Sequence, residues 1–304
     1  MFDVAIIGLG AAGYTAAIYA ARYKLSTLIV GEEEGGMSVT AAEVGNWPGD
    51  IEVAGADLLA RFKKHALNFS EVTHKNVRVE KVEKTKEGFR LHFVGGGSED
   101  ARSVIFATGS RKRSLGAPGE KEFAGKGVSY CATCDAFFYR GKTVAVIGGG
   151  DAAVEGAAIV AQVAKQVYLI HRRKELRAEP YWSQKLKEKT NVTFVLERTV
   201  KEIKGDQRVT GIVLDQPFEG GSALKLDGVF IEIGSVPSVE VAQALGCALD
   251  ERGYLQVDAA QQTSVPGVFA AGDVTSASNH FAQIVTAAGE GAVAVSGVFE
   301  FLQG

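Results

Sequence analysis

The 304-residue sequence lacks several features that mark specialised classes of protein. Three cysteines are too few for a disulfide framework, and we expect no apolar run of the roughly 18 residues that a membrane helix needs. A formal net charge of −3 gives no electrostatic reason to expect a nucleic acid partner. The N-terminus leads into an apolar segment without the cationic region of a signal peptide. We therefore expect a cytoplasmic protein with no membrane and no nucleic acid as partner.

Glycine is the residue that the sequence has in abundance. Its 37 glycines show no short repeat and gather at turns between apolar runs and helical segments, which is typical of nucleotide binding. The five histidines are scattered, so we expect no metal site. The chain is longer than one ordinary domain, and two domains are the starting expectation.

Two segments of the chain have the order strand, tight turn, helix, strand. In the first, the apolar run Val4–Ile7 ends in glycine and precedes a helical stretch from Ala11 to Ala21 and a second apolar run from Thr27 to Val30. The order recurs in Thr143–Ile147, Asp151–Ala164 and Val167–Ile170. Each is the βαβ unit of a doubly wound parallel sheet. The expected fold class is α/β, with two Rossmann-like dinucleotide-binding domains.

Two breaks rich in proline and glycine suggest where the chain passes between the domains. They are Gly116–Gly119 and Gly234–Pro237, and either would permit a hinge. After them, an apolar strand ends in Gly272-Asp273 and a helix follows from about Gln283 to Phe301. If this tail completes the first domain, the domains are 1–115 with 237–304, and an inserted domain of 116–236.

The first glycine motif is Gly8-x-Gly10-x-x-Gly13. It follows a strand and opens a helix, where the glycines permit a tight turn, an approach to pyrophosphate and close helix packing. Glu32 or Glu33, at the end of the second strand, is expected to bind ribose hydroxyls. The motif alone does not separate FAD from NAD, but the distant Gly272-Asp273 loop suits the ribityl chain of a flavin.

The second motif, Gly148-x-Gly150-x-x-Ala153, repeats this logic with a different strand end. The second strand ends in His171-Arg172-Arg173, followed by Arg177, where the first has acids. Guanidinium groups bind a 2′-phosphate through charge-assisted hydrogen bonds, whereas a carboxylate would repel it. A solvated basic turn is the alternative interpretation. The pattern predicts NADPH rather than NADH.

The segment Cys131-Ala132-Thr133-Cys134 predicts a working dithiol. Two cysteines one helical turn apart can close a reversible disulfide, and Asp135 beside them can accept or return a proton. Half of a zinc site is the alternative, but the sequence has no second Cys-x-x-Cys or histidine pair. The third cysteine, Cys247, reads as a small buried apolar residue.

The segment from Val128 to Tyr139 resembles the redox-active segment of low-molecular-weight thioredoxin reductases. So do Gly36 through Gly49, His171 through Ala178, and Ala271 through Val274, in the same order and spacing. The resemblance implies a homodimer in which electrons pass from NADPH to FAD, then to Cys131–Cys134, then to thioredoxin. It implies an NADPH domain inserted into the FAD domain, with Cys134 facing the flavin and Asp135 as acid/base.

The resemblance also implies contact sets. For FAD these are Gly8, Gly10, Ala11, Ala12, Gly13, Glu32, Glu33, Gly36, Met37, Asn46, Thr108, Gly109, Gly272, Asp273, Ala282, Gln283 and Ile284. For NADPH they are Gly148, Gly150, Asp151, Ala152, Ala153, Glu155, His171, Arg172, Arg173, Arg177, Ile233 and Gly234. Lys126, Gly127, Phe137 and Phe138 match the stretches that meet thioredoxin, although phenylalanines are more often core residues. Trp47 is either a flavin-side residue or a structural one.

The sequence departs from the family pattern at several positions. Met37 replaces a common glutamine and Ala136 a common glycine. Ala282 stands where the family usually has arginine or lysine, a cation that would stabilise reduced, anionic flavin. Two alternatives follow. One is a related dithiol reductase or oxidase whose acceptor is a peroxiredoxin system, another small disulfide protein or oxygen. The other is a non-catalytic NADPH-responsive module without FAD.

Overall fold

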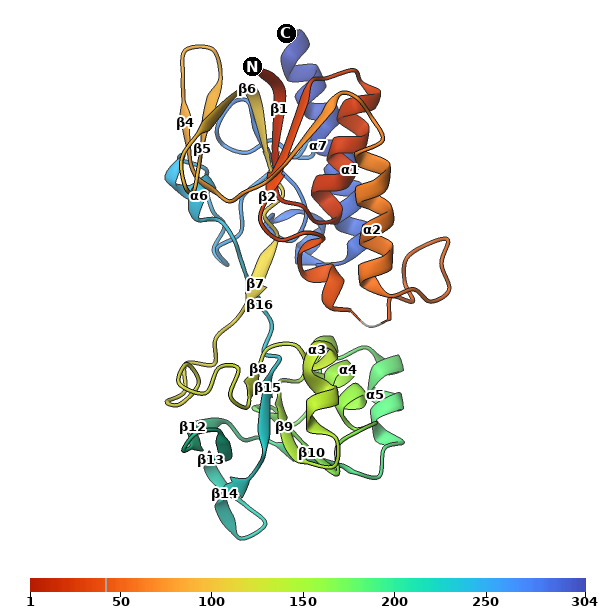
Figure 1. Ribbon diagram of the computed structural model, residues 1–304, viewed down its shortest axis with the longest axis vertical. Helices are drawn as coiled ribbons and strands as arrows, with labels where there is room; N and C mark the ends of the chain where they lie inside the picture. The colour runs from red at the N-terminus through yellow and green to blue at the C-terminus, as the bar shows by residue number, and fades with distance from the viewer. Residues whose placement is uncertain (42) are drawn as a thin grey trace. The chain divides into compact units, whose positions relative to one another are not determined.

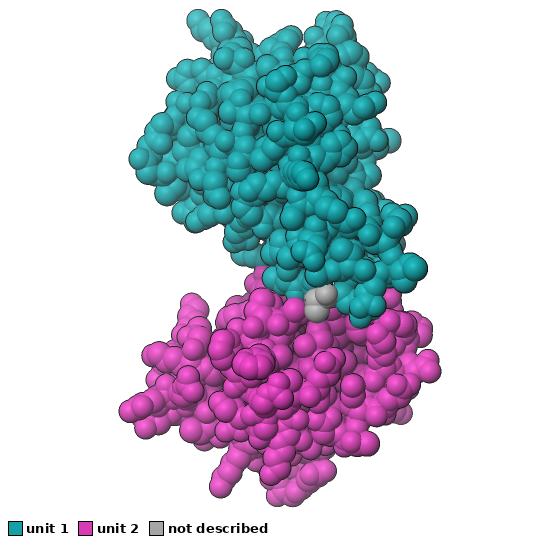
Figure 2. Space-filling view, turned by 45° about the vertical axis from the view of Figure 1, so that its right-hand side comes forward, with its two compact units in different colours: residues 1–111, 237–304 teal, residues 112–236 magenta. Residues whose placement is uncertain are grey.

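The computed structural model describes residues 1–41 and 43–304 and divides the chain into two compact units (Figures 1 and 2). Unit 1 comprises Met1–Arg111 and Pro237–Gly304, and unit 2 comprises Lys112–Val236. Unit 2 is therefore inserted into unit 1. The first boundary lies at 111/112 rather than at the 115/116 expected from the sequence, and the second lies at 236/237.

A mixed sheet forms the centre of unit 1, with a strand order of β3-β2-β1-β6-β5-β4 and β17 paired with β6. Its parallel strands are β1 (Phe2–Ile7), β2 (Thr27–Gly31), β3 (Val72–Asn76), β6 (Ser98–Phe106) and β17 (Val268–Ala270). The antiparallel strands are β4 (Val79–Lys84) and β5 (Phe89–Phe93). The continuous apolar runs of β1 and β2 are buried because elements cover both faces of the sheet.

Helices α1 (Ala11–Arg22), α2 (Gly55–Ala66) and α7 (Ile284–Gln303) lie side by side on one face of this sheet (Figure 1). A Cβ at Gly291 of α7 would lie 2.3 Å from the carbonyl oxygen of Ala12, so only glycine allows α7 to approach α1 this closely. The short helix α6 (Glu240–Ala244) packs on the opposite face, beside β4.

Helix α7 is long and apolar enough, by length and composition, to span a membrane. This corrects the expectation from the sequence that no apolar run reaches such a length, because the helix is apolar on average although it contains Glu290 and Glu300. One side of α7 is buried within unit 1, and its spacing is that of a helix packed on a core. These buried residues are Ala287, Ala288, Glu290, Gly291, Ala294, Val295, Gly297 and Val298.

Unit 2 contains a five-stranded parallel sheet with the order β11-β10-β9-β15-β8. The strands are β8 (Val128–Ser129), β9 (Thr143–Ile147), β10 (Gln166–His171), β11 (Val192–Leu196) and β15 (Gly228–Ile231). One face packs on α3 (Ala132–Asp135), η2 (Ala136–Tyr139), α4 (Asp151–Val160) and α5 (Pro180–Lys187). The other face is covered by the antiparallel strands β12 (Val200–Gly205), β13 (Val209–Phe218) and β14 (Gly221–Lys225).

The two passages of the chain between the units form a two-stranded sheet of β7 (Ser110–Lys112) and β16 (Ser235–Pro237). Glycines stand beside both strands: Gly109 has φ +58° and Gly234 has φ +93°, conformations that glycine adopts most readily. The second expected crossing therefore coincides with a passage.

The first expected crossing, Gly116–Gly119, lies inside unit 2. A Cβ at Gly119 would meet the carbonyl oxygen of Ile203 at 2.1 Å, and Ile203 N donates to Pro118 O at 2.9 Å. The segment is therefore packed against β12, and its glycine serves close packing there.

Glu120 holds the chain that leads into this segment. The residue is 1% exposed, and its carboxylate accepts hydrogen bonds from Ser114 Oγ (2.8 Å), Leu115 N (2.9 Å), Gly116 N (2.6 Å) and Tyr130 OH (2.8 Å). Burial acts to raise the pKa of Glu120, but the four hydrogen bonds outweigh it and hold the pKa below its usual range. One buried carboxylate thus joins the start of unit 2 to the residue before Cys131.

We expect Glu120→Gln to lower the free energy of unfolding by about 2 to 4 kcal/mol, because an amide nitrogen would face donors inside a buried site. Denaturant unfolding measures the change. Glu122→Gln, on an exposed neighbour, is the matched control. Because the folded-state pKa is lowered, the stabilisation is present above the ordinary glutamate pKa and is lost as the pH falls through the lowered value. Equal stability of the two variants would contradict this role.

Candidate functional site

The turn after β1 has the geometry of a dinucleotide-binding turn. Gly8 has φ +126°, and a Cβ there would lie 2.0 Å from the carbonyl oxygen of Ala107. A Cβ at Gly13 would lie 2.0 Å from the carbonyl oxygen of Gly8, whereas one at Gly10 would meet nothing within 4 Å. Gly8 thus serves the turn, Gly13 serves helix packing, and Gly10 leaves an open surface at the start of α1.

Distant segments of unit 1 converge on this turn. Gly35 N donates to Leu9 O at 2.8 Å, and the Cβ position of Gly36 is 3.6 Å from Gly10 Cα. From the C-terminal part of the chain, the Cβ position of Gly272 lies 3.0 Å from Ala12 Cβ. Thr108 and Gly109 follow β6, whose carboxyl end neighbours that of β1. The structure therefore brings together the predicted flavin-side residues from both ends of the sequence.

The acidic run Glu32-Glu33-Glu34 follows β2 at the same edge of the sheet. Glu34 is engaged with Tyr14 OH, Lys63 Nζ (2.9 Å) and His74 Nε2 (3.2 Å). Glu32 and Glu33 are exposed, and Glu32 approaches Arg78 only to 3.8 Å. Glu32 and Glu33 are therefore the carboxylates that stay available to a ribose.

The predicted residues around the start of α7 also meet others from the first half of the chain. Asn46 Nδ2 donates to Gln283 Oε1 at 2.9 Å, and Ile284 opens the helix directly after it. Trp47 packs edge-on against Phe62 of α2, with ring centroids 5.1 Å apart, so it has a structural contact. Ala282 is exposed and brings no charge to this region.

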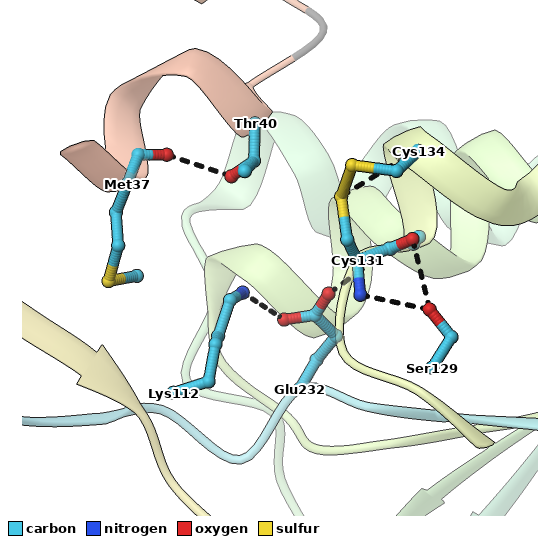
Figure 3. Close-up of a disulfide and its surroundings, with 8 residues drawn as sticks. Met37, Thr40, Lys112, Ser129, Cys131, Cys134 and Glu232 are labelled. Carbon is cyan, nitrogen blue, oxygen red and sulfur yellow. Dashed lines mark hydrogen bonds and ion pairs between the residues drawn. A yellow bond between two sulfur atoms is a disulfide. The ribbon is translucent and has the colours of Figure 1, made fainter. Parts of the chain in front are cut away.

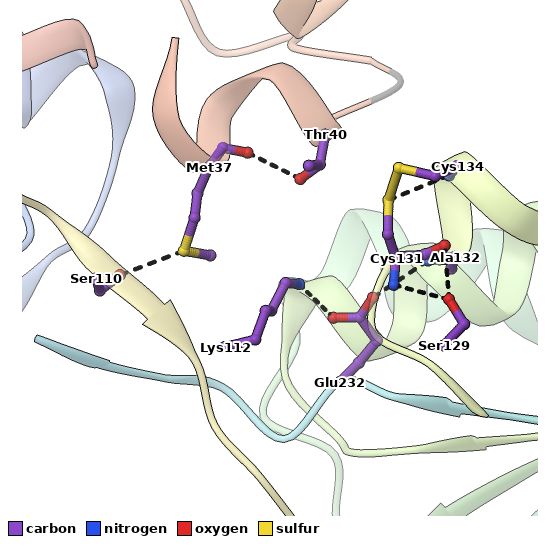
Figure 4. A network of polar contacts seen from close by, with 9 residues as sticks. All are labelled: Met37, Thr40, Ser110, Lys112, Ser129, Cys131, Ala132, Cys134 and Glu232. Atoms are coloured by element: carbon purple, nitrogen blue, oxygen red, sulfur yellow. Dashed lines mark hydrogen bonds and ion pairs between the residues drawn. A yellow bond between two sulfur atoms is a disulfide. The ribbon is translucent and has the colours of Figure 1, made fainter. Parts of the chain in front are cut away.

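Met37 lies on η1 (Gly36–Thr40) and is held at both ends. Its sulfur accepts a hydrogen bond from Ser110 Oγ at 3.5 Å, and its carbonyl oxygen accepts from Thr40 Oγ1 at 2.8 Å (Figure 4). The thioether replaces the amide common in the family with a weak acceptor and no donor.

A buried acid that sequence reasoning missed supports the Gly272–Asp273 loop. Glu290 of α7 accepts hydrogen bonds from Gly272 N (2.8 Å), Thr275 Oγ1 (2.9 Å) and Ser278 Oγ (2.5 Å). Burial, followed by the charge of Glu290, raises the pKa of Asp273 to about 6. In the sequence, the indication of this buried acid was a single glutamate among the apolar residues on one face of the last helix.

The observations in unit 1 fit FAD. An open glycine at a helix start, two acids at the next strand end and a second acid-bearing loop are the parts that bind pyrophosphate, ribose and ribityl groups. All seventeen predicted FAD residues lie in unit 1. Their individual contacts with FAD remain predictions.

Unit 2 repeats the turn after β9. Gly148 has φ +146°, and a Cβ there would lie 2.1 Å from the carbonyl oxygen of Glu232 and 2.6 Å from Ala153 Cβ. The His171 ring covers Gly149, where a Cβ would meet it at 2.4 Å, and a Cβ at Gly150 would meet nothing within 4 Å. As in unit 1, the open glycine begins the following helix.

The three arginines surround the end of β10. Arg172, Arg173 and Arg177 are exposed, and Arg177 N donates to Gly149 O at 2.6 Å, which ties the basic turn to the glycine turn. Burial lowers the pKa of His171, and the charges of Arg177, Arg173 and Arg172 lower it further. His171 Nε2 is buried and has no hydrogen-bond partner among the described residues. A cluster of positive charge beside an open glycine and an unpaired imidazole nitrogen fits a phosphorylated dinucleotide.

The remaining predicted NADPH residues occupy the same edge of the unit 2 sheet. Ala152 and Glu155 lie on α4, and Ile233 and Gly234 follow β15. Asp151 Oδ1 accepts a hydrogen bond from Glu179 N at 2.6 Å, so its carboxylate fixes the start of α5.

Cys131 and Cys134 form a disulfide just beyond the carboxyl end of β8 (Figure 3). Cys131 caps α3: its sulfur accepts from Cys134 N at 3.2 Å, and its own N donates to Ser129 Oγ at 3.0 Å. Cys134 is exposed and Cys131 is half-buried. Since all five strands are parallel, this disulfide lies at the same edge of the sheet as the second glycine turn.

The residues after the disulfide correct one expectation. Phe137 and Phe138 are 70% and 69% exposed, so their interpretation as core residues was wrong. The Arg140 guanidinium carbon lies 5.3 Å from the centre of the Phe137 ring. Burial raises the pKa of the Tyr139 phenol, and the charge of Asp135 raises it further. Cys247 is buried, as expected, and burial raises the pKa of its thiol.

Comparison with known proteins supports this geometry. The family model for pyridine nucleotide-disulphide oxidoreductases matches residues 2–291. The chain belongs to this family. It is 41% identical to the thioredoxin reductase of Listeria innocua, covering 97% of this chain and 92% of that one. It is 39% identical to one component of the alkyl hydroperoxide reductase of Pseudomonas aeruginosa, covering 99% of this chain and 58% of that one.

A solved structure agrees with the fold. The thioredoxin reductase of Lactococcus lactis matches with a TM-score of 0.94 and 34% identity, covering 100% of this chain and 99% of that one. The expected α/β class with two dinucleotide-binding domains is thereby confirmed. The chain is a flavoprotein disulfide reductase with FAD and NADPH as its cofactors.

For Asp273→Asn we expect opposite effects on the apoprotein and on FAD binding. The raised folded-state pKa means that stability falls as the pH rises from about 4 to about 6, because the buried group must ionise. The variant has no carboxyl group to ionise at this position, so its stability should not decrease over this pH range. It should be about 1 to 2 kcal/mol more stable than the parent at pH 7 and equal to it near pH 4. Its FAD affinity should drop about tenfold.

Thermal unfolding of apoprotein across this pH range and FAD titration at pH 7 measure the two effects. Glu251→Gln, on an exposed carboxylate of unit 1, is the control. An Asp273→Asn apoprotein with the parent's pH dependence would rule out the raised pKa.

Arg173→Ala should raise the KM for NADPH about 10- to 100-fold and leave the KM for NADH nearly unchanged, because only NADPH carries the 2′-phosphate. Steady-state kinetics with both nucleotides measures the ratio. Lys174→Ala, at the exposed next position, is the control. Equal losses with the two nucleotides would refute 2′-phosphate recognition at this turn.

Proposed function

We propose that this chain is a thioredoxin-disulfide reductase, which transfers electrons from NADPH through FAD and the Cys131–Cys134 disulfide to thioredoxin. The observation that carries the proposal is a disulfide at the carboxyl edge of the parallel sheet of unit 2. The glycine turn after β9, which has the geometry of a dinucleotide-binding turn, lies at the same edge. The identity of 41% with a thioredoxin reductase over nearly the whole chain supports thioredoxin as the acceptor.

When bound, FAD supplies a two-electron carrier between NADPH and the disulfide. The residues of the chain provide the rest. Arg172, Arg173 and Arg177 hold the 2′-phosphate, and the open Gly150 admits the pyrophosphate. In unit 1, Glu32 or Glu33 binds the ribose and Asp273 the ribityl hydroxyls.

The dithiol performs the exchange with thioredoxin. In the reduced enzyme the Cys131 thiolate attacks the thioredoxin disulfide and forms a mixed disulfide, releasing one thioredoxin thiolate that takes up a proton. The Cys134 thiolate then attacks Cys131 Sγ, which releases the second thioredoxin sulfur and restores the Cys131–Cys134 disulfide. Asp135, next to Cys134, holds the proton that a dithiol must lose and regain in this cycle.

We further propose that thioredoxin docks on the exposed surface of unit 2 beside the disulfide. Phe137 and Phe138 stand out into solvent, directly after the redox segment, and two large exposed aromatics in sequence are suited to a partner surface. The exposed Lys126 precedes Gly127 at the entrance to β8.

The setting of the protein is part of the proposal. We propose that it acts in the cytoplasm as a homodimer, without a membrane or nucleic acid as partner. Three cysteines, of which two form the working pair and one is buried, suit a reducing compartment. Burial of one face of α7 within unit 1 supports a helix packed on a protein core rather than one that spans a membrane.

A second candidate keeps the cofactors and the dithiol but changes the acceptor. The 39% identity to a component of alkyl hydroperoxide reductase favours a peroxiredoxin system among the alternatives, although the chain spans only 58% of that relative. Stopped-flow mixing of the NADPH-reduced enzyme with thioredoxin, with a peroxiredoxin and with oxygen separates these acceptors. Fastest reoxidation by thioredoxin is expected, and faster reoxidation by either of the others would replace the proposal.

The variant Cys134→Ser tests the relay. It should still accept a hydride from NADPH, seen as bleaching of the flavin absorbance, but lose thioredoxin reduction by a factor of at least about 10³, because no dithiol can form. Cys247→Ser should retain both activities, since Cys247 is a buried residue of unit 1. Thioredoxin reduction by Cys134→Ser at the parent's rate would end the proposal.

A further inference from the structure

An ion pair with a buried carboxylate lies beside the redox segment, at a place that neither the glycine motifs nor the dithiol pattern indicates. Lys112 Nζ is 2.6 Å from Glu232 Oε2, and the Glu232 side chain is 5% exposed (Figures 3 and 4). Lys112 is the first residue of unit 2, and Glu232 follows the last residue of β15. Both residues belong to unit 2, which also carries the disulfide.

The second oxygen of Glu232 contacts the redox segment itself. Glu232 Oε1 accepts a hydrogen bond from the backbone N of Ala132, the residue after Cys131, at 3.4 Å. A Cβ at Gly156 of α4 would lie 2.9 Å from Ala132 Cβ and 3.9 Å from Glu232 Cγ. The absence of a side chain at Gly156 therefore allows the segment and the carboxylate to lie together against α4.

The backbone of Glu232 faces the other functional part of the unit. Its N donates to Ile147 O at 2.8 Å, and its carbonyl oxygen is the atom that a Cβ at Gly148 would meet at 2.1 Å. One residue therefore touches the dinucleotide turn with its main chain and the redox segment with its side chain.

The charge balance at this place acts on the reduced dithiol. A carboxylate next to Cys131 opposes ionisation of its thiol, and the Lys112 ammonium compensates for it. The other ionisable residues on α3 and on the two elements packed beside it are Asp135 on α3, Tyr139 on η2, and Asp151 and Glu155 on α4. Lys112 is the cation that pairs with the Glu232 carboxylate.

We propose that Lys112 and Glu232 are positioning residues that govern how readily the Cys131 thiol ionises, and thereby how fast the reduced enzyme attacks a disulfide substrate. The inference rests on the proposed role of Cys131 as the attacking sulfur. An ion pair that served only as a structural link between β15 and α3 would not change how readily this thiol ionises.

The test measures the thiol directly. In a Cys134→Ser background, the rate of Cys131 alkylation by iodoacetamide is followed from pH 5 to 10, with mass spectrometry to confirm the modified residue. Glu232→Gln leaves Lys112 unopposed and should raise the rate at pH 7 about 3- to 10-fold. Lys112→Met should lower it by a similar factor, and the double variant should return close to the parent.

Lys204→Met breaks an exposed ion pair with Glu202 (3.7 Å) in the same unit and is the matched control, with no change expected. If Glu232→Gln fails to fold, Lys112→Met, at a partly exposed residue, still tests the inference through its lowered alkylation rate. Superimposable pH profiles in all folded variants would overturn the inference. Alkylation needs neither thioredoxin nor NADPH, so this result is independent of whether thioredoxin proves to be the acceptor.

Discussion

The parallel arrangement of the unit 2 sheet is the constraint on which the function of this protein depends. Strands β8, β15, β9 and β10 all run in one direction, so their carboxyl ends meet at one edge. That edge places Cys131, Glu232, Gly148 and His171 at the ends of these four strands in turn. A dinucleotide site and a redox disulfide are therefore carried by one compact unit.

The same turn is built twice, and the differences between the copies separate two nucleotides. Gly8 and Gly148 each lie so close to a carbonyl oxygen of a neighbouring strand that a Cβ would overlap it, at 2.0 and 2.1 Å. Both turns then present an open glycine at the helix start. Beyond the turn they diverge: Glu32 and Glu33 follow β2, whereas His171 ends β10 and three arginines follow it. We propose that the residues at the strand end, rather than the turn, separate a ribose hydroxyl from a phosphate.

Local features of the sequence predicted the fold, both glycine turns and the disulfide. Glycine spacing, apolar runs and Cys-x-x-Cys are patterns within short segments, which is why β1, α1, β9 and the disulfide lie where they were expected. Long-range contacts were not readable. Glu120 appeared as one acid in a charged turn, and its four donors became visible only in three dimensions. Lys112 and Glu232 are 120 positions apart, and no short pattern joins them.

Two further differences arise because composition does not determine exposure. The phenylalanines at 137 and 138 follow a buried alanine, yet the short helical turn directs both outward. Gly116 and Gly119 resembled a flexible passage, but the segment is packed on β12 and held by Glu120. Glycine can serve close packing as well as flexibility, and only its neighbours in the structure distinguish the two.

Anaerobic titration of the purified protein with NADPH tests the central claim most directly. The absorbance of the flavin and the number of reactive thiols are recorded at each addition. If one chain carries a bound flavin in communication with the Cys131–Cys134 disulfide, about two equivalents of NADPH are consumed and two thiols appear. A protein that remains colourless after addition of FAD, or one whose flavin is reduced while no thiol forms, would contradict it.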